Sequence, residues 1–425
     1  MHLKYFLPDW DDRLDQDFDF INDSYSVGHI KDPYGHDSYA HQLLDYPPYD
    51  GLLISLSIFE SKLKLGNFNV APKIRDKENI RAYLKIPRNS KLKVMGDCGA
   101  FSYVDKKEPP LPFYSVENIA TLYEKLGFDY GVSVDHLVMD YILTKDKETG
   151  KRKKRFLSEE EKKERIKITI RNAEKFKAFC EDNRCNFIPI GVAQGYDTVT
   201  YIESVNSLIN LGYEYLAIGG LVQYTSEFIL NLLKELQPFI KDRKVHLFGI
   251  LRPKHLKTFE EMGVSSFDSA SFFRKAWLKS EQNYLSAEGK WYSAIRVPQS
   301  SNPRLMKNAD INGFSSEDLK RMEKDALQAL IQYDEGKVDI NYALNTVLEY
   351  DNLLLRGTSD VKNLKPRYMR TLSDMPWRSC NCSLCKKLGI QIIIFRGCNR
   401  NKRRGFHNVW AFRQLSQNDE QKQFD

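Results

Sequence analysis

The sequence lacks the features that would place the protein in a membrane or outside the cell. It has no cationic start followed by an apolar stretch and a small-residue cleavage site. No uninterrupted apolar run approaches the roughly 18 residues that a membrane span needs. Biased low-complexity tracts are also absent, while 42% of the 425 residues are apolar. These absences predict a folded, cytoplasmic protein with no membrane segment.

Cysteine is scarce in most of the chain, because four of the seven cysteines lie near the C-terminus. An odd number crowded in one place indicates metal binding in a reducing compartment rather than a disulfide framework. Cys380, Cys382 and Cys385 have C-x-C-x-x-C spacing, and His407 follows. This set is typical of a closed, structural Zn²⁺ site with four protein ligands. Cys398 is the alternative fourth ligand, and ordinary thiols without a metal are the other interpretation.

The net charge of +7 is modest, but positive charge is concentrated in two clusters. The first surrounds a glycine and contains Lys151, Arg152, Lys153, Lys154 and Arg155. The second lies beside the cysteine motif and contains Arg396, Arg400, Lys402, Arg403 and Arg404. Both clusters are predicted to contact phosphates of a nucleic-acid backbone. For the first, a solvated loop that leads into a charged helix at 158–177 is an equally good interpretation.

Short apolar runs alternate with amphipathic stretches up to about residue 300. This alternation is typical of βα units around a parallel sheet, and the continuous apolar runs indicate strands that are buried on both faces. The predicted strands cover residues 49–57, 93–99, 130–136, 187–195, 215–221, 244–251 and 265–271.

Seven or eight such units predict an α/β fold of the (β/α)8 barrel type. An open, doubly wound sheet is the alternative, but no G-x-G-x-x-G follows the first predicted strand. We expect a barrel with an N-terminal extension over residues 1–300 and a helical segment over 301–360 that completes it. A zinc-binding basic module is expected over 361–425.

Aspartates stand at the ends of three predicted strands, at Asp97, Asp135 and Asp268. In a barrel the C-terminal ends of the strands form the active face. One aspartate alone could be a helix cap, but three converge there with Gln194 and the Gly219–Gly220 pair. Carboxylates that face one another suit attack at a sugar carbon, with one as nucleophile and one as general acid and base. The glycine pair suits a flat heterocycle held close to the backbone.

Several motifs occur in an order that resembles one enzyme family. They are DCGAF at 97–101, VAQG at 192–195, AIGGL at 217–221, HLFGI at 246–250, FDSASFFR at 267–274 and the cysteine motif with its histidine. In this order they resemble the guanine transglycosylases, whose best-known members exchange guanine for a 7-deazaguanine in tRNA. The resemblance spans roughly residues 95–275 and 380–408.

The resemblance implies a role for each matching residue. Asp268 would attack C1′ and hold the nucleoside covalently, while Asp97 would protonate the departing guanine and deprotonate the incoming base. Asp135 would accept hydrogen bonds from guanine, and Gln194 and the backbone of Gly220 would read its carbonyl side. The remaining substrate-site positions are Cys98, Phe101, Gly219, Leu221, Phe248 and Arg274. Among these, Phe101 and Phe248 would stack on the base, and Arg274 would hold the sugar-phosphate or brace Asp268.

Three segments resemble the DpdA-type branch, which inserts a 7-deazaguanine, usually the 7-cyano form, into DNA. They are FLPDWDDRLDQDFDF near the N-terminus, KWYSAIRVP at 290–298 and FRGCNRNKRRGFHN near the C-terminus. DNA is therefore the expected substrate, with its target nucleotide flipped out or unpaired. The alternatives are a tRNA-guanine transglycosylase and a non-catalytic zinc protein that binds nucleic acid. The need for a helper protein and the oligomeric state stay open.

Overall fold

The computed structural model describes residues 3–417 except Trp10 and residues 61–78, 146–150, 279–280 and 356–360. The chain forms two compact units. The first unit contains Met1–Asp11 and Tyr49–Ala270, and the second contains Asp12–Pro48 and Ser271–Asp425.

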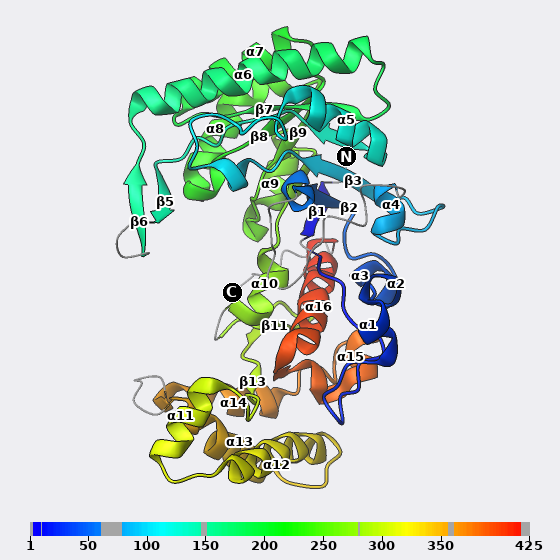
Figure 1. The fold of residues 1–425 in the computed structure, drawn as a ribbon, viewed down its shortest axis with the longest axis vertical. Coiled ribbons are helices and arrows are strands. Elements are labelled where there is room, and N and C mark those ends of the chain that lie inside the picture. Colours follow the sequence, from blue (N-terminus) through cyan, green and yellow to red (C-terminus); the bar gives the residue numbers. More distant parts are fainter. Residues whose placement is uncertain are drawn as a thin grey trace. The chain divides into compact units, whose positions relative to one another are not determined.

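Eight parallel strands of the first unit close into a barrel in the order β1-β10-β9-β8-β7-β4-β3-β2. Figure 1 labels several of these strands. The strands are β1 (Lys4–Asp9), β2 (Gly51–Ser55), β3 (Lys93–Asp97), β4 (Tyr130–Val132), β7 (Ile188–Ala193), β8 (Tyr215–Ile218), β9 (Lys244–Leu247) and β10 (Ser266–Asp268). The predicted barrel is confirmed, and each of the seven predicted strands is present within its range. The eighth strand, β1, was not predicted, because its run is short and contains Pro8.

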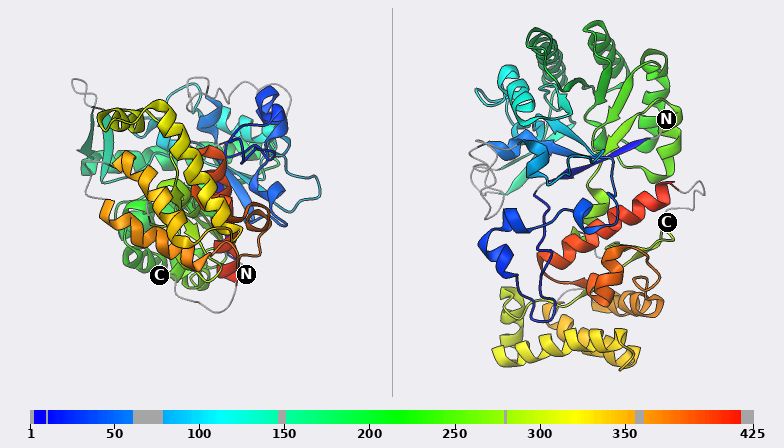
Figure 2. Two further views of the ribbon diagram at one scale, coloured as in Figure 1. Left: turned by 90° about the horizontal axis from the view of Figure 1, so that it is seen from below. Right: turned by 90° about the vertical axis from the view of Figure 1, so that its right-hand side faces the viewer.

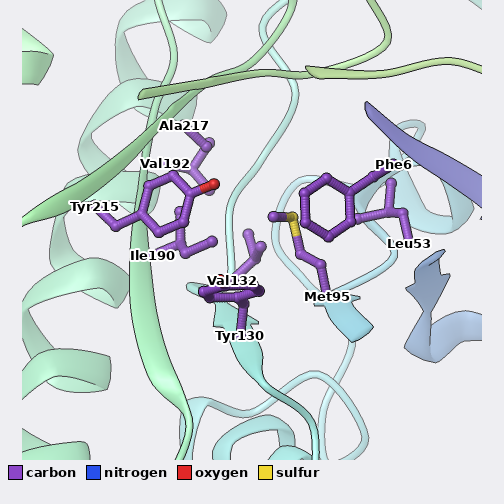
Figure 3. Packing of buried hydrophobic residues seen from close by; sticks show 9 residues of the cluster. All are labelled: Phe6, Leu53, Met95, Tyr130, Val132, Ile190, Val192, Tyr215 and Ala217. Atoms are coloured by element: carbon purple, nitrogen blue, oxygen red, sulfur yellow. The ribbon is translucent and has the colours of Figure 1, made fainter. Parts of the chain in front are cut away.

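The interior of the barrel is filled by side chains that alternate inward along the strands (Figure 3). The cluster consists of Phe6, Leu53, Met95, Tyr130, Val132, Ile190, Val192, Tyr215 and Ala217. Because this packing leaves a solid core rather than a channel, a ligand can reach the barrel only at its ends.

Helices on the outside of the barrel follow the strands (Figure 2). The long ones are α5 (Val116–Leu126), α6 (Glu159–Asp182), α7 (Thr198–Asn210) and α8 (Ser226–Ile240), and the short ones are α4 (Ile80–Tyr83) and α9 (Leu256–Glu261). Four of these helices have an N-cap side chain that accepts a hydrogen bond from a backbone N–H of the first turn. The N-cap residues are Ser115, Ser158, Asp197 and Thr225. Short 3-10 helices lie at η1 (Leu56–Phe59), η2 (Ala100–Tyr103), η3 (Leu221–Gln223) and η4 (Pro253–His255).

An antiparallel ribbon of β5 (Tyr141–Lys145) and β6 (Arg152–Phe156) is inserted between β4 and α6. In Figure 1 the ribbon extends away from the strands of the barrel. The basic cluster 151–155 therefore lies on a strand and the residue before it, rather than in an irregular loop.

The second unit is mainly helical. Its elements are α1 (Val27–Lys31), α2 (Pro33–His36), α3 (Ala40–Leu43), α10 (Ser271–Leu278), β11 (Tyr284–Leu285), β12 (Trp291–Tyr292), β13 (Ile295–Arg296), α11 (Pro303–Ile311), α12 (Ser316–Asp334), α13 (Ile340–Leu355), α14 (Val361–Asp374), α15 (Ser383–Leu388), η5 (Gly389–Ile392), β14 (Ile394–Phe395) and α16 (Gly397–Gln417). Helix α16 packs against α10, and α12 lies beside α13 (Figure 2).

The structure divides the chain differently from the predicted parts. Residues 12–48 and 271–300 were expected with the barrel, and the helices of 301–360 were expected to complete it, but all of them group with residues 361–425. The barrel needs no further element, because β1 pairs with both β10 and β2 and so closes the ring.

No helix in the described part of the chain combines the length and hydropathy that crossing a membrane requires.

Candidate active site

Three carboxylates meet at the C-terminal end of the barrel. Asp97 is the last residue of β3, Asp268 is the last residue of β10, and Asp135 follows the end of β4 by three residues. Asp135 is 4% exposed and Asp268 is 5% exposed. The three strand ends therefore bring acidic side chains to the face where barrel enzymes carry their active sites.

The Asp97 carboxyl is adjusted to exchange a proton near neutral pH. Burial, followed by the negative charge of Asp135, raises the pKa of Asp97 to about 7, and the charge of Asp268 adds to this. Hydrogen bonds from the Gly99 backbone and the Ser55 side chain act in the opposite direction but do not cancel the effect. A carboxyl group with such a pKa can act as both a general acid and a general base.

The Asp268 carboxylate is held by two hydrogen bonds that both end on Oδ1. The Gly249 backbone N–H donates at 2.8 Å, and His246 Nε2 lies at 3.1 Å. On the other side of the ring, His246 Nδ1 lies 2.7 Å from Ser266 Oγ, which is 2.6 Å from the Tyr215 hydroxyl. A buried polar chain thus fixes the orientation of the carboxylate and leaves Oδ2 outside these bonds.

His246 was not predicted as a site residue, although it lies inside the HLFGI motif. It is fully buried, and a buried histidine on a barrel strand is expected to have polar partners. The signal in the sequence was the strand period of two, because His246 and Phe248 are two positions apart in the predicted strand 244–251 and Phe248 was selected.

Asp135 is engaged by two residues that the sequence also selected. Cys98 Sγ–H donates to Oδ1 at 3.1 Å, and Gln194 Nε2–H donates to Oδ2 at 2.7 Å. Burial raises the pKa of Asp135, while these two hydrogen bonds oppose the increase. The Tyr103 hydroxyl, which was not predicted, lies 3.3 Å from Cys98 Sγ and donates to the Asp135 carbonyl at 2.7 Å.

The glycine pair after β8 makes room for the Gln194 amide. A Cβ atom on Gly219 would lie 2.3 Å from Gln194 Nε2, and one on Gly220 would lie 2.9 Å from Gln194 Oε1. Gly220 also has a φ of 74°, which favours glycine. The next residue, Leu221, is fully buried, so its side chain serves packing.

The two aromatic residues of the predicted base sandwich differ in exposure. Phe101, on η2, is 63% exposed, whereas Phe248 is half-buried and packs against the barrel core. A phenylalanine so exposed beside buried carboxylates has a face that is available for stacking. Arg274 lies on α10 in the second unit, so its predicted contact with the sugar-phosphate stays a prediction.

Known proteins are similar to this chain in sequence. Residues 143–311 match the queuine tRNA-ribosyltransferase family. A DNA-guanine transglycosylase from Salmonella montevideo is 36% identical over 414 residues, which are 96% of this chain and 95% of that protein. The chain belongs to the guanine transglycosylase family. A tRNA-guanine(15) transglycosylase from Nanoarchaeum equitans (strain Kin4-M) is 34% identical over 120 residues, 27% of this chain and 28% of that protein. The protein is therefore a glycosyl-transferring enzyme, and the predicted resemblance to the DNA branch is confirmed.

The second unit of this transglycosylase contains the predicted metal-binding group. The ligand atoms of Cys380, Cys382, Cys385 and His407 all lie within 4.8 Å of one another, and all four residues are buried. His407 Nδ1 is 3.7, 3.4 and 3.3 Å from the three sulfur atoms. A tetrahedral zinc ion with ordinary bond lengths would separate nitrogen and sulfur ligands by about 3.6 Å, so the residues fit this metal. The rival ligand Cys398 is exposed and lies outside the group.

The orientation of the His407 ring is fixed by its neighbours. His407 Nε2 lies 2.8 Å from the Leu285 carbonyl oxygen, so its proton has a partner and Nδ1 faces the three sulfurs. The Tyr284 ring stacks on the imidazole with centroids 4.1 Å apart. Such support of a ligating histidine is typical of a metal site that is built in advance.

The prediction that the arginines beside the cysteine motif contact nucleic acid is wrong. Arg400, Arg403 and Arg404 are at most 1% exposed. Their guanidinium groups donate to protein acceptors. Arg400 binds Asp23, Arg403 binds the Asp15 carbonyl, and Arg404 binds the carbonyls of Ala276, Ile392 and Ile394. A phosphate cannot approach donors that are buried and already bonded.

The spacing of these arginines could have shown their burial. One face of α16 carries Arg400, Arg403, Arg404 and His407, because successive members of this set are three, one and three positions apart. Lys402 lies on the same helix, is half-buried and donates to the Arg13 carbonyl at 2.7 Å. The cluster was predicted to contact phosphates because its charge masked its helical period.

The first basic cluster differs from the second in its exposure. Four side chains are exposed, those of Lys151, Arg152, Lys153 and Lys154. Arg155 is half-buried and forms an ion pair with Glu161 at 2.8 Å. Of the two predicted clusters, the one on the ribbon is therefore the one that an external polyanion can reach.

Proposed function

We propose that the enzyme replaces guanine in DNA with a 7-deazaguanine, and that 7-cyano-7-deazaguanine is the incoming base. The proton-exchanging Asp97, beside the carboxylates of Asp135 and Asp268, is the observation that carries this proposal. The choice of DNA is supported by the relative that acts on DNA, which matches 96% of the chain, whereas the tRNA relative matches 27%.

The first half of the reaction removes guanine. Oδ2 of Asp268 attacks C1′ while the bond from C1′ to the guanine nitrogen breaks, and the proton of Asp97 moves to the departing base. His246 and Gly249 support this step, because their hydrogen bonds to Oδ1 aim the other oxygen outward. The product is a covalent ester between Asp268 and the sugar, which preserves the energy of the broken bond.

The second half reverses the roles. Asp97, now ionised, accepts the proton from the ring nitrogen of the 7-deazaguanine, and this nitrogen attacks C1′ as Asp268 leaves. Two displacements retain the configuration of the sugar. A pKa of about 7 supports both halves, since Asp97 has to be protonated in one and ionised in the other.

Recognition of the base falls to the residues around Asp135. Its carboxylate accepts the guanine amine and ring N–H, while the Gln194 amide and the Gly220 N–H bind the carbonyl side. In the structure Cys98 and Gln194 already donate to this carboxylate, and each oxygen has a second lone pair for the ligand. Phe101 and Phe248 cover the two faces of the base.

We further propose that Cys380, Cys382, Cys385 and His407 bind one structural Zn²⁺. With four protein ligands the ion has no position for water or substrate, so it supplies folding energy rather than chemistry. Removal of zinc by a chelator should lower the melting temperature of the second unit, and Cys382→Ser should do the same without chelator. A zinc content near zero in the purified, folded protein would contradict this proposal.

The test of the proposed reaction is incorporation of labelled guanine into duplex DNA, single-stranded DNA and tRNA by the purified enzyme. We expect label in DNA, and release of guanine from DNA when 7-cyano-7-deazaguanine is supplied. Asp268→Asn should abolish both while DNA binding persists. Asp242→Asn, an exposed carboxylate in the loop before β9, is the matched control and should be active.

Two results would overturn the proposal. Label in tRNA alone would reject DNA as the substrate. Normal exchange by Asp268→Asn, or the absence of a denaturant-stable link between wild-type protein and DNA during turnover, would reject the covalent intermediate.

A further inference from the structure

The ribbon of β5 and β6 is connected directly to the active site within the first unit. β5 begins six residues after Asp135, so the base of the ribbon lies at most about 20 Å from that carboxylate along the chain. The connection is tied to the barrel, because the Val138 N–H donates to Gln194 Oε1 at 3.3 Å and the Asp140 N–H donates to Gln223 Oε1 at 2.7 Å. A ligand on the ribbon and a base in the site could therefore belong to one strand of nucleic acid.

One face of the ribbon packs against the protein. Ile142 and Arg155 are cross-strand partners on this face. Ile142 is 2% exposed, and Arg155 forms its ion pair with Glu161 of α6. This face holds the ribbon in place.

The opposite face, which we call the outer face, combines exposed apolar and cationic side chains. Tyr141 pairs with Phe156 and Leu143 pairs with Lys154, while Arg152 lies further along the same face of β6. Phe156 is 70% exposed and Leu143 is 52% exposed. The Lys154 ammonium lies 4.1 Å from the centroid of the Tyr141 ring.

This composition is not what a solvated ribbon requires. The outward side of a two-stranded ribbon gains no stability from an exposed phenylalanine, and polar residues would serve solubility better. Neither of the two described strands contains an acidic residue, so β5 and β6 themselves place no carboxylate beside the cations of the outer face. Exposed aromatic rings beside cationic side chains match a partner that has both flat apolar faces and negative charge.

We propose that the outer face binds unpaired nucleotides of the substrate strand next to the flipped-out guanine. Bases stack on Phe156 and Tyr141, and the adjoining phosphates contact Arg152 and Lys154. Contact with an intact duplex would need only the cations, because duplex bases are already stacked on each other, whereas an exposed aromatic ring gains from a base with a free face. The proposal rests on the proposed function only in taking nucleic acid as the ligand.

The test measures binding separately from exchange. Fluorescence anisotropy would compare a labelled single-stranded oligonucleotide, the duplex of the same length, and an abasic strand with the same number of phosphates. Phe156→Ala in the full-length protein should weaken binding of the single strand about 5- to 100-fold and leave the abasic strand and the duplex unchanged. Phe156→Trp should restore the affinity, since it keeps a stacking surface.

Two controls separate stacking from other effects. Phe239→Ala removes an aromatic ring that is 36% exposed in the last turn of α8, away from the ribbon, and should not change the affinity. Arg152→Ala with Lys154→Ala should weaken single strand, abasic strand and duplex together and reduce the dependence on salt. A melting curve for each variant checks folding.

The outcomes decide the proposal without reference to catalysis. Equal affinity of wild-type protein and Phe156→Ala for the single strand would overturn it, as would equal binding of the abasic and the normal strand by the wild type. An equal loss for single strand and duplex would mean that the ribbon is a phosphate clamp and that stacking is wrong. Because Asp268→Asn can be used throughout, failure of exchange would not affect the result.

Discussion

The raised pKa of Asp97 predicts that this one carboxyl makes the protein less stable as the pH rises. A carboxyl with a pKa of about 7 in the folded protein and 3.8 when unfolded binds its proton more tightly in the folded state. Its contribution to stability is fully present below about pH 3.8 and is lost as the pH rises through 7. The whole effect amounts to about 4 kcal/mol, at 1.36 kcal/mol for each pKa unit.

The Asp97→Asn variant should remove this dependence, because the amide has nearly the same shape and does not ionise. Between about pH 5.5 and about pH 8.5, linkage predicts that the free energy of unfolding of the wild type falls by about 2 kcal/mol because Asp97 ionises. The variant does not show this loss. Urea unfolding followed by circular dichroism at several pH values measures this difference. Asp105→Asn removes an exposed carboxylate from the following loop and controls for the loss of one charge.

The same group should be visible in the kinetics. If Asp97 exchanges the proton, kcat/KM should fall as the pH rises through about 7, because the departing guanine needs the protonated form. Parallel pH profiles of stability for wild type and Asp97→Asn would refute the reasoning about burial and like charges. A kinetic profile that is flat between about pH 5.5 and about pH 8.5 would refute the assignment as the acid.

Three further changes test other parts of the structure. His246→Phe removes a hydrogen bond to Asp268 and should lower kcat about 10- to 100-fold with little change in KM, which steady-state kinetics would show; an unchanged kcat would contradict its positioning role. Gly219→Ala places a Cβ atom against the Gln194 amide and should raise KM for the base at least about tenfold, and normal KM would mean that Gln194 does not read the base. Arg404→Met leaves three backbone carbonyls without their donor and should lower the free energy of unfolding by about 2–5 kcal/mol. The protein that remains folded should bind DNA normally. Weakened DNA binding at full stability would restore the interpretation that this arginine contacts nucleic acid.

Local patterns in the sequence predicted the parts of the molecule that depend on near neighbours. Continuous apolar runs indicated strands buried on both faces, and their number indicated a barrel. The spacing of Cys380, Cys382 and Cys385 is itself a local property, since a short turn brings three sulfurs together. β1 was missed because its apolar run is too short to stand out, and it is a strand chiefly because β10 and β2 lie on either side of it.

Charge was the least reliable local pattern. The sequence KRKKR on the ribbon and the arginines on α16 have similar composition, yet the first is largely exposed and the second is buried. The difference arises from distant partners, because Asp23 and the carbonyl of Ala276 reach the α16 arginines from segments far away in the chain.

The sequence by itself determined the fold class, the three acidic strand ends and the group of four residues that can hold a metal, since each depends on residue type and short spacing. Only the tertiary structure decided which charges are buried, that His246 binds Asp268, and that Asp97 titrates near neutral pH. The physical reason is that desolvation and Coulomb interactions depend on all the groups that surround an atom. Asp97, Asp135 and Asp268 are distant in the chain, and their effect on one another arises only when the barrel closes.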